Sequence, residues 1–94
     1  MFKYINKQGV ESDQGFIVQF VGRFEVEYRE DAGVISIYVE PDYTPSQEFC
    51  LQIDSDAFTH WIDGASVPFE KQSEIISNFK AAMRFQNIKI IFNQ

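Results

Sequence analysis

The sequence of 94 residues has few of the residue types that usually build chemical sites in small proteins. It contains one cysteine, Cys50, and one histidine, His60, so it can form no intramolecular disulfide and offers no zinc-ligand set. No apolar run approaches the ~18 residues that span a bilayer, and the N-terminal residues MFKYINKQGV lack the apolar core of a signal peptide. We therefore expect one cytoplasmic domain over residues 1–94, without a metal, a cofactor or a membrane partner.

Basic residues are missing from the middle of the chain. Nine acidic residues and no lysine or arginine lie between Glu30 and Glu70, whereas the part after Glu74 holds three basic residues and no acid. An acidic surface repels nucleic acid and anionic membranes and attracts basic proteins. The charge therefore predicts a basic protein partner and no nucleic acid, with solubility alone as the alternative role of the acidic residues.

Two segments with alternating apolar and polar residues, 24–29 and 34–40, predict a β-hairpin. Its apolar face is expected to hold Phe24, Val26, Tyr28, Ile35, Ile37 and Val39. For these residues to share one face, paired residue numbers must sum to an odd number. A two-residue turn meets this condition, as does a four-residue loop with Gly33 at positive φ, but a three-residue loop does not. The opposite face then carries Glu25, Glu27, Arg29, Ser36, Tyr38 and Glu40.

The rest of the chain supplies further strands and one long helix. The expected strands are 2–5, 15–21, 48–53 and 88–92, with a polar loop over 6–14. In the strand 48–53, Phe49, Leu51 and Ile53 are expected to face the core and Cys50 to face outward. Cys50 is interpreted as an inert strand residue.

A helix is predicted from Pro68 to Phe85, because apolar residues recur there at helical spacing and Asn87 suits a left-handed stop. Its apolar stripe is Ile75, Ile76, Phe79, Ala82 and Met83. Before it, the acidic cap residues at 54–56 predict a short helical turn whose apolar residues include Phe58, Trp61 and Ile62. We expect Phe58, Trp61 and Ile62 to be buried.

These elements together predict an α+β fold. A mainly antiparallel β-sheet and one long α-helix each have one apolar surface, and each can bury it on the other. The expected architecture therefore has two layers, with the helix packed on one face of the sheet and a short helical turn beside it.

Several residues at characteristic spacing also carry a family resemblance. They are Gly15-Phe16, Tyr28-Arg29-Glu30, Ile35-Ser36-Ile37, Glu40-Pro41, Trp61, Glu74-Ile75-Ile76, Phe79, Ala82 and Phe85. In this pattern, over roughly residues 15–92, the chain resembles the small immunity proteins of bacterial polymorphic-toxin and contact-dependent growth-inhibition systems, and in particular the immunity protein 74 family. The resemblance implies a single immunity-type domain that is not an enzyme. It implies that the protein binds one cognate toxin domain, often a nuclease, in the cytoplasm and neutralises it as a monomer in a 1:1 complex.

The partner-binding surface is expected to combine carboxylates with tyrosines, because the rings supply buried area and the acids supply steering toward a basic partner. The candidate residues are Glu25, Glu27, Tyr38, Glu40, Asp42, Tyr43, Asp54, Asp56 and Asp63. Two alternatives remain open for the tyrosines: Tyr38 packs under the N-terminal segment, and Tyr43 packs into the core.

Two other classes of function remain as alternatives. One is an acidic mimic of nucleic acid, which would share the composition but would inhibit many DNA- or RNA-binding proteins, or another protein-interaction module. A small enzyme would need a pocket that holds His60 with a carboxylate partner, because no other histidine is available as a base. The adjacent carboxylates Glu25 and Glu27 are more typical of a solvated strand face than of an acid/base pair.

Overall fold

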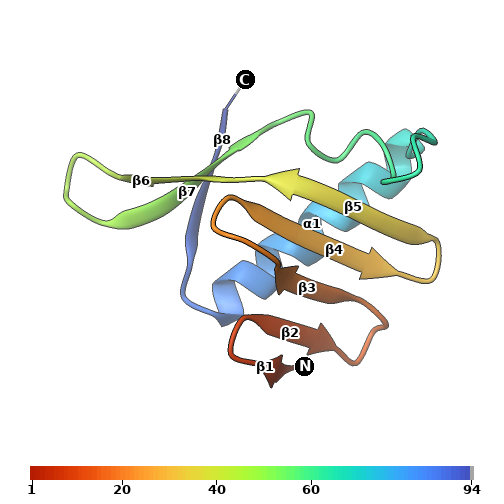
Figure 1. Cartoon of the computed structure of the whole chain (residues 1–94), viewed down its shortest axis with the longest axis horizontal. Coiled ribbons are helices and arrows are strands. Elements are labelled where there is room, and N and C mark those ends of the chain that lie inside the picture. The colour runs from red at the N-terminus through yellow and green to blue at the C-terminus, as the bar shows by residue number, and fades with distance from the viewer. Residues whose placement is uncertain (94) are drawn as a thin grey trace.

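The computed structural model describes residues 1–93 and shows eight strands and one helix in an α+β arrangement (Figure 1). The strands are β1 (Phe2–Asn6), β2 (Gly9–Ser12), β3 (Ile17–Phe20), β4 (Glu25–Glu30), β5 (Gly33–Tyr38), β6 (Glu40–Tyr43), β7 (Phe49–Asp54) and β8 (Lys89–Asn93), and the helix is α1 (Phe69–Phe85). They form a five-stranded antiparallel sheet in the order β1-β2-β3-β4-β5 and a three-stranded sheet in the order β6-β7-β8. The predicted fold class is confirmed.

The β4–β5 hairpin has the register that the alternation predicts. Val26 pairs with Ile37 and Tyr28 pairs with Ile35, so the paired numbers sum to an odd value. Glu30 pairs with Gly33, so the strands are joined by a two-residue turn, which is one of the two connections that the alternation permits. All but one of the predicted apolar-face residues are fully buried: Val26, Tyr28, Ile35, Ile37 and Val39.

Phe24 is the exception on that face, and its predicted place in the core is wrong. It precedes β4 and is 43% exposed. Its carbonyl still accepts a hydrogen bond from the Val39 N–H at 2.9 Å, but the ladder ends there because β5 gives way to β6. The side chain lies beside Tyr38, with 6.2 Å between the ring centroids. Without a strand beyond it, Phe24 lies at the margin of the sheet, where the core does not cover it.

The N-terminal region contains a strand that the sequence did not predict. Residues 6–14 were expected to be a polar loop, but Gly9–Ser12 forms β2 between β1 and β3. Its register places Val10 opposite both Tyr4 and Val18. The strand exists because two neighbours share its hydrogen bonds, since only one of its four residues is a large apolar one.

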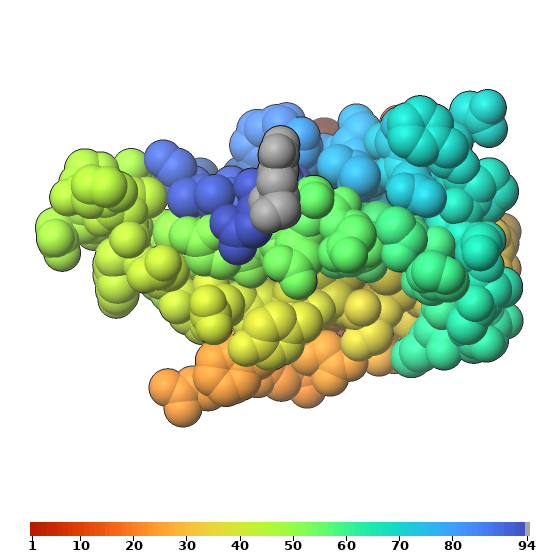
Figure 2. Space-filling view, turned by 90° about the horizontal axis from the view of Figure 1, so that it is seen from above, coloured from red at the N-terminus to blue at the C-terminus, as the bar shows by residue number. Residues whose placement is uncertain are grey.

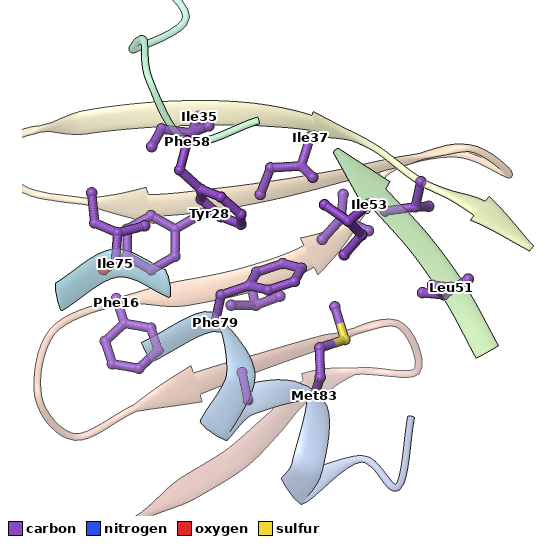
Figure 3. Close-up of a cluster of buried hydrophobic side chains, with 14 of the residues drawn as sticks. Phe16, Tyr28, Ile35, Ile37, Leu51, Ile53, Phe58, Ile75, Phe79 and Met83 are labelled. Atoms are coloured by element: carbon purple, nitrogen blue, oxygen red, sulfur yellow. The ribbon is translucent and has the colours of Figure 1, made fainter. Parts of the chain in front are cut away.

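α1 begins after Pro68 and buries the predicted stripe. Ile75, Phe79, Ala82 and Met83 are buried, and Ile76 is partly buried against the core. Figure 3 shows the side chains of Ile75, Phe79 and Met83 pointing toward residues of both sheets, among them Tyr28, Ile37, Leu51 and Ile53. Within residues 1–93 no helix is long and apolar enough to cross a membrane.

The helix ends at the predicted stop. Asn87 has φ 58°, and its N–H donates to the Arg84 carbonyl at 3.1 Å while the Ile88 N–H donates to the Met83 carbonyl at 2.9 Å. This is the Schellman pattern, which satisfies the last carbonyls of a helix when a residue adopts the left-handed conformation. The chain then reverses into β8, which runs parallel to β7.

Two details of β7 differ from the prediction. Leu51 and Ile53 are buried as expected, but Phe49 is 49% exposed and Cys50 is fully buried. Phe49 lies on the part of the β6–β7 hairpin that projects beyond the helix (Figure 1), so nothing from α1 covers it. Cys50 lies in the central strand of its sheet, opposite Asp42 of β6 and Lys89 of β8, and these neighbours flank it.

The predicted helical turn after β7 is present as two hydrogen-bonded turns. The Ala57 N–H donates to the Asp54 carbonyl, and the Thr59 N–H donates to the Asp56 carbonyl. The turns stop before Trp61. Phe58 is fully buried as predicted and Trp61 is partly buried against the core, but Ile62 is 63% exposed, so its predicted burial is wrong.

Candidate functional site

The outer face of the five-stranded sheet faces away from α1 and bears three of the predicted binding residues, Glu25, Glu27 and Tyr38. Glu25 pairs directly with Tyr38, and Glu27 pairs with Ser36. Tyr38 is 62% exposed, so the alternative that it packs under the N-terminal segment is excluded. Glu25 accepts a hydrogen bond from the Ser36 hydroxyl, which holds this carboxylate beside the tyrosine.

Phe24 and Arg23 join this face, although the sequence analysis did not select them as binding residues. The Arg23 guanidinium lies 5.5 Å from the centre of the Phe24 ring, and Phe24 in turn lies against Tyr38. A shallow depression of about 470 Å³ forms between them, lined by Gly22, Arg23, Phe24, Glu25, Ser36 and Tyr38. The Gly22-Arg23 pair before Phe24, which interrupts the strand pattern, was the available signal for this exposure.

Glu40 extends the same surface along the chain. It is exposed and pairs with Gln52 of β7, two residues before Asp54. Figure 2 looks along the edge of the sheet and shows the segment around residues 22–25 next to the one around residues 38–40, with the segment around residues 52–56 beyond it. We call the set Phe24, Glu25, Tyr38 and Glu40 the acidic–aromatic surface. Two carboxylates and two exposed rings are what a binder of a basic partner needs.

The tip of the β6–β7 hairpin carries a second exposed aromatic pair. Tyr43 and Phe49 are 63% and 49% exposed, and their ring centroids lie 5.8 Å apart. The alternative that Tyr43 packs into the core is therefore excluded. Asp42 is exposed, and its carboxylate accepts a hydrogen bond from the Tyr43 N–H at 2.8 Å. A hydrogen bond from the Thr44 N–H to the Glu48 carbonyl closes the loop between β6 and β7.

The remaining predicted residues do not all join one site. The Glu27 side chain is largely buried and paired with Arg29, so its charge is partly neutralised. Asp54 and Asp56 are exposed where β7 ends. Asp63 caps its own turn by accepting a hydrogen bond from the Ala65 N–H, and the segment 60–68 lies at the opposite end of the long axis from the β6–β7 tip (Figure 2).

His60 and Cys50 do not form a reactive site with the groups around them. His60 is exposed and pairs across an isolated bridge with Ser66, and the hydrogen-bond partner of its ring within residues 1–93 is the Thr59 hydroxyl at 3.0 Å. Cys50 is a buried free thiol. The described residues hold no group of three side chains that could ligate a metal ion. The hydrogen bonds of residues 1–93 thus give His60 a hydroxyl partner and not the carboxylate partner that the enzyme alternative requires.

A polar network ties the inner face of the hairpin to α1. The Tyr28 hydroxyl donates to Glu30 at 2.7 Å and accepts from Asn78 at 3.0 Å. Burial raises the pKa of Tyr28 well above its ordinary value, and the Glu30 carboxylate raises it further, while the Asn78 hydrogen bond opposes the shift. Lys71 contacts Glu30 and Glu74 at 2.7 and 2.8 Å, and these hydrogen bonds raise the pKa of Lys71. Because these polar groups are mutually satisfied, the network fixes α1 on the sheet.

Comparisons with protein-family models, curated proteins and solved structures find no match to this chain.

Proposed function

We propose that this protein is an immunity-type inhibitor that binds a basic toxin domain of the nuclease type through the acidic–aromatic surface and occludes its active site. The proposal is supported by one observation above others, the exposure of Phe24 and Tyr38 between the carboxylates Glu25 and Glu40 on a sheet face that α1 does not cover. Exposed aromatic rings are costly in water and supply much of the binding energy when a partner buries them.

The resemblance to immunity protein families suggests that the partner is a toxin domain, and the negative charge of this chain suggests that the partner is positively charged. The net charge of −6 favours encounter with a basic domain and disfavours binding to nucleic acid. In this proposal the protein acts in the cytoplasm as a monomer in a 1:1 complex. Asp42, Tyr43, Asp54 and Asp56 extend the contact along β6 and the end of β7.

Co-expression tests the proposal directly. The reading frame upstream of this gene is expected to encode a large effector, and its C-terminal domain should be toxic alone and harmless when this protein is co-expressed. Survival no better than with an empty vector would overturn the assignment. Protection against many unrelated nucleases would instead support the mimic of nucleic acid, which is the second class that an acidic chain fits.

Matched variants locate the surface. Tyr38→Ala combined with Glu40→Lys should abolish protection while leaving the fold intact. Tyr4→Ala combined with Asp31→Lys removes another exposed tyrosine and an acid at the other end of the hairpin, and it should protect as the wild type does. Loss of protection by the control pair alone would place the contact elsewhere.

A further inference from the structure

The edge of the three-stranded sheet carries a groove whose charge is opposite to that of the acidic–aromatic surface. β8 is the last strand in the order β6-β7-β8, and within residues 1–93 no strand lies on its other side. A depression of about 320 Å³ lies between β8 and α1. We call it the β8 groove, and it is lined by Lys80, Arg84, Ile88, Ile90 and Phe92.

The backbone of β8 has hydrogen-bonding groups available at this edge. The Asn93 carbonyl accepts from the Ser55 N–H at 2.8 Å, so the backbone of Asn93 faces β7. In a parallel ladder successive residues turn their N–H and C=O groups to opposite sides. Those of Ile90 and Phe92 therefore point to the open edge, where an unpaired strand is a template for another strand.

The side chains beside this edge form an apolar floor. Ile90 pairs with Leu51 and Phe92 pairs with Ile53, and both pairs lie on the face of the sheet that meets α1. Ile90 and Phe92 are only partly buried, so part of each side chain stays open to the groove. An added strand would place every second side chain against this floor.

Two cations on α1 border the groove. Lys80 and Arg84 are one helical turn apart and exposed, and neither forms an ion pair within residues 1–93. The Lys80 ammonium lies 5.3 Å from the centre of the Phe92 ring, which places the charge over the apolar floor. A ligand that fills the groove would gain most from carboxylates at the positions that face these two side chains.

We propose that the β8 groove binds an extended acidic segment of a second partner protein, which adds to β8 as a further strand. The segment would alternate apolar side chains, which pack on Ile90 and Phe92, with acidic side chains, which pair with Lys80 and Arg84. Symmetric pairing of β8 with the β8 of a second copy is disfavoured, because it would bring the cations of both copies together. This contact is independent of the proposed toxin-binding surface, which lies on the other side of the five-stranded sheet from α1.

The test uses the full chain and a defined probe. The probe is a capped ten-residue peptide in which valine alternates with aspartate or glutamate, and binding is followed by fluorescence anisotropy and by backbone amide chemical shifts. We expect saturable binding with shifts concentrated in β8 and the second half of α1. Lys80→Glu combined with Arg84→Glu should weaken binding at least tenfold. Lys3→Glu combined with Lys7→Glu changes the net charge equally at the N-terminal end and should leave binding within twofold.

Two control peptides separate strand addition from general charge attraction. Replacing the acids with lysine should abolish binding, and methylating the peptide nitrogens that face β8 should weaken it at least tenfold, because the added ladder would lose its donors. Failure of the acidic peptide to bind would overturn the proposal, as would equal binding of the methylated peptide or shifts elsewhere. A dimer in sedimentation that Lys80→Glu with Arg84→Glu dissociates would assign the groove to a second copy instead. Toxin protection that survives the same double substitution would show that the two surfaces are independent.

Discussion

Gly33 is the residue at which the hairpin turn meets the segment after β7. Its φ is 153°, and a Cβ at this position would lie 3.0 Å from Cε3 of Trp61. Both the backbone conformation and the contact oppose a larger residue, so we expect Gly33→Ala to lower the free energy of unfolding by about 1–3 kcal/mol. Urea denaturation measures the loss. Gly22→Ala, where a Cβ would meet nothing within 4 Å, should change it by less than about 0.5 kcal/mol. Equal losses at the two glycines would show that Trp61 does not constrain the turn.

Tyr28 makes the stability of the domain depend on alkaline pH. Burial first, and then the Glu30 carboxylate, raise the pKa of its hydroxyl above the ordinary value of about 10. A folded-state pKa above the unfolded one gives stability that is fully present below about pH 10 and is lost as the pH rises toward the folded-state pKa. Between pH 8 and pH 11 the wild type should therefore lose more free energy of unfolding than Tyr28→Phe.

At neutral pH the Tyr28→Phe substitution should itself cost about 1 kcal/mol, because Asn78 and Glu30 lose a hydrogen-bond partner. Tyr38→Phe removes a hydroxyl at the surface and is the control for the pH series. The same loss between pH 8 and pH 11 in the wild type and in Tyr28→Phe would contradict the role assigned to the buried hydroxyl.

At the scale of elements, the sequence predicted the strands and the helix whose own residues show a clear spacing of apolar side chains. The β4–β5 register follows from alternation alone, because a shift by one residue would expose Val26 and Ile37. The buried stripe of α1 follows equally from its spacing. β2 could not be predicted in this way, because Val10 is its one large apolar residue and its partners lie in β1 and β3.

The candidate site shows the same limit. Tyr38 and Glu25 were selected because alternation puts them on the outer face, and both are exposed there. Phe24 was assigned to the opposite face by the same alternation. Its exposure depends on where β5 ends and β6 begins, which no local pattern records. Phe49 was misassigned for a related reason, since the length of β7 that α1 covers is a tertiary property. Cys50 was misassigned because its burial depends on the strands β6 and β8 that flank it.

The end of α1 allows a direct test of its stop signal. Asn87 has φ 58°, a left-handed conformation that costs most residues other than glycine and asparagine about 1–2 kcal/mol. We expect Asn87→Ala to lower the free energy of unfolding by about 1 kcal/mol, and Asn87→Gly to leave it unchanged or raise it slightly. Both substitutions remove the amide side chain, so their difference in thermal or urea denaturation isolates the backbone term. Equal losses would show that the amide group itself holds the turn.

The molecule as a whole separates two kinds of surface. The acidic–aromatic surface lies on the side of the five-stranded sheet away from α1, and the β8 groove lies beside α1. Exposed charges are largely screened from one another beyond the Debye length, which is about 8 Å at physiological salt. We therefore expect a partner that approaches one surface to respond mainly to the charges of that surface.

This separation predicts how association with the toxin domain should respond to salt and to charge substitutions. The association rate should fall steeply between about 10 mM and 150 mM salt while the dissociation rate changes little, because steering acts before the contact forms. Stopped-flow fluorescence or surface plasmon resonance measures both rates. Glu40→Gln combined with Asp42→Asn should lower the association rate and flatten its salt dependence. Lys80→Gln combined with Arg84→Gln makes the chain more negative by the same two charges that the first pair removes. It should still change the association rate less than twofold, because these two side chains lie on α1 beside the β8 groove and not in the proposed contact. The association rate could instead follow the net charge alone, falling in the first variant and rising by a similar factor in the second. That result would show that the acidic residues act through the total charge of the domain and not through the surface that they share with Phe24 and Tyr38.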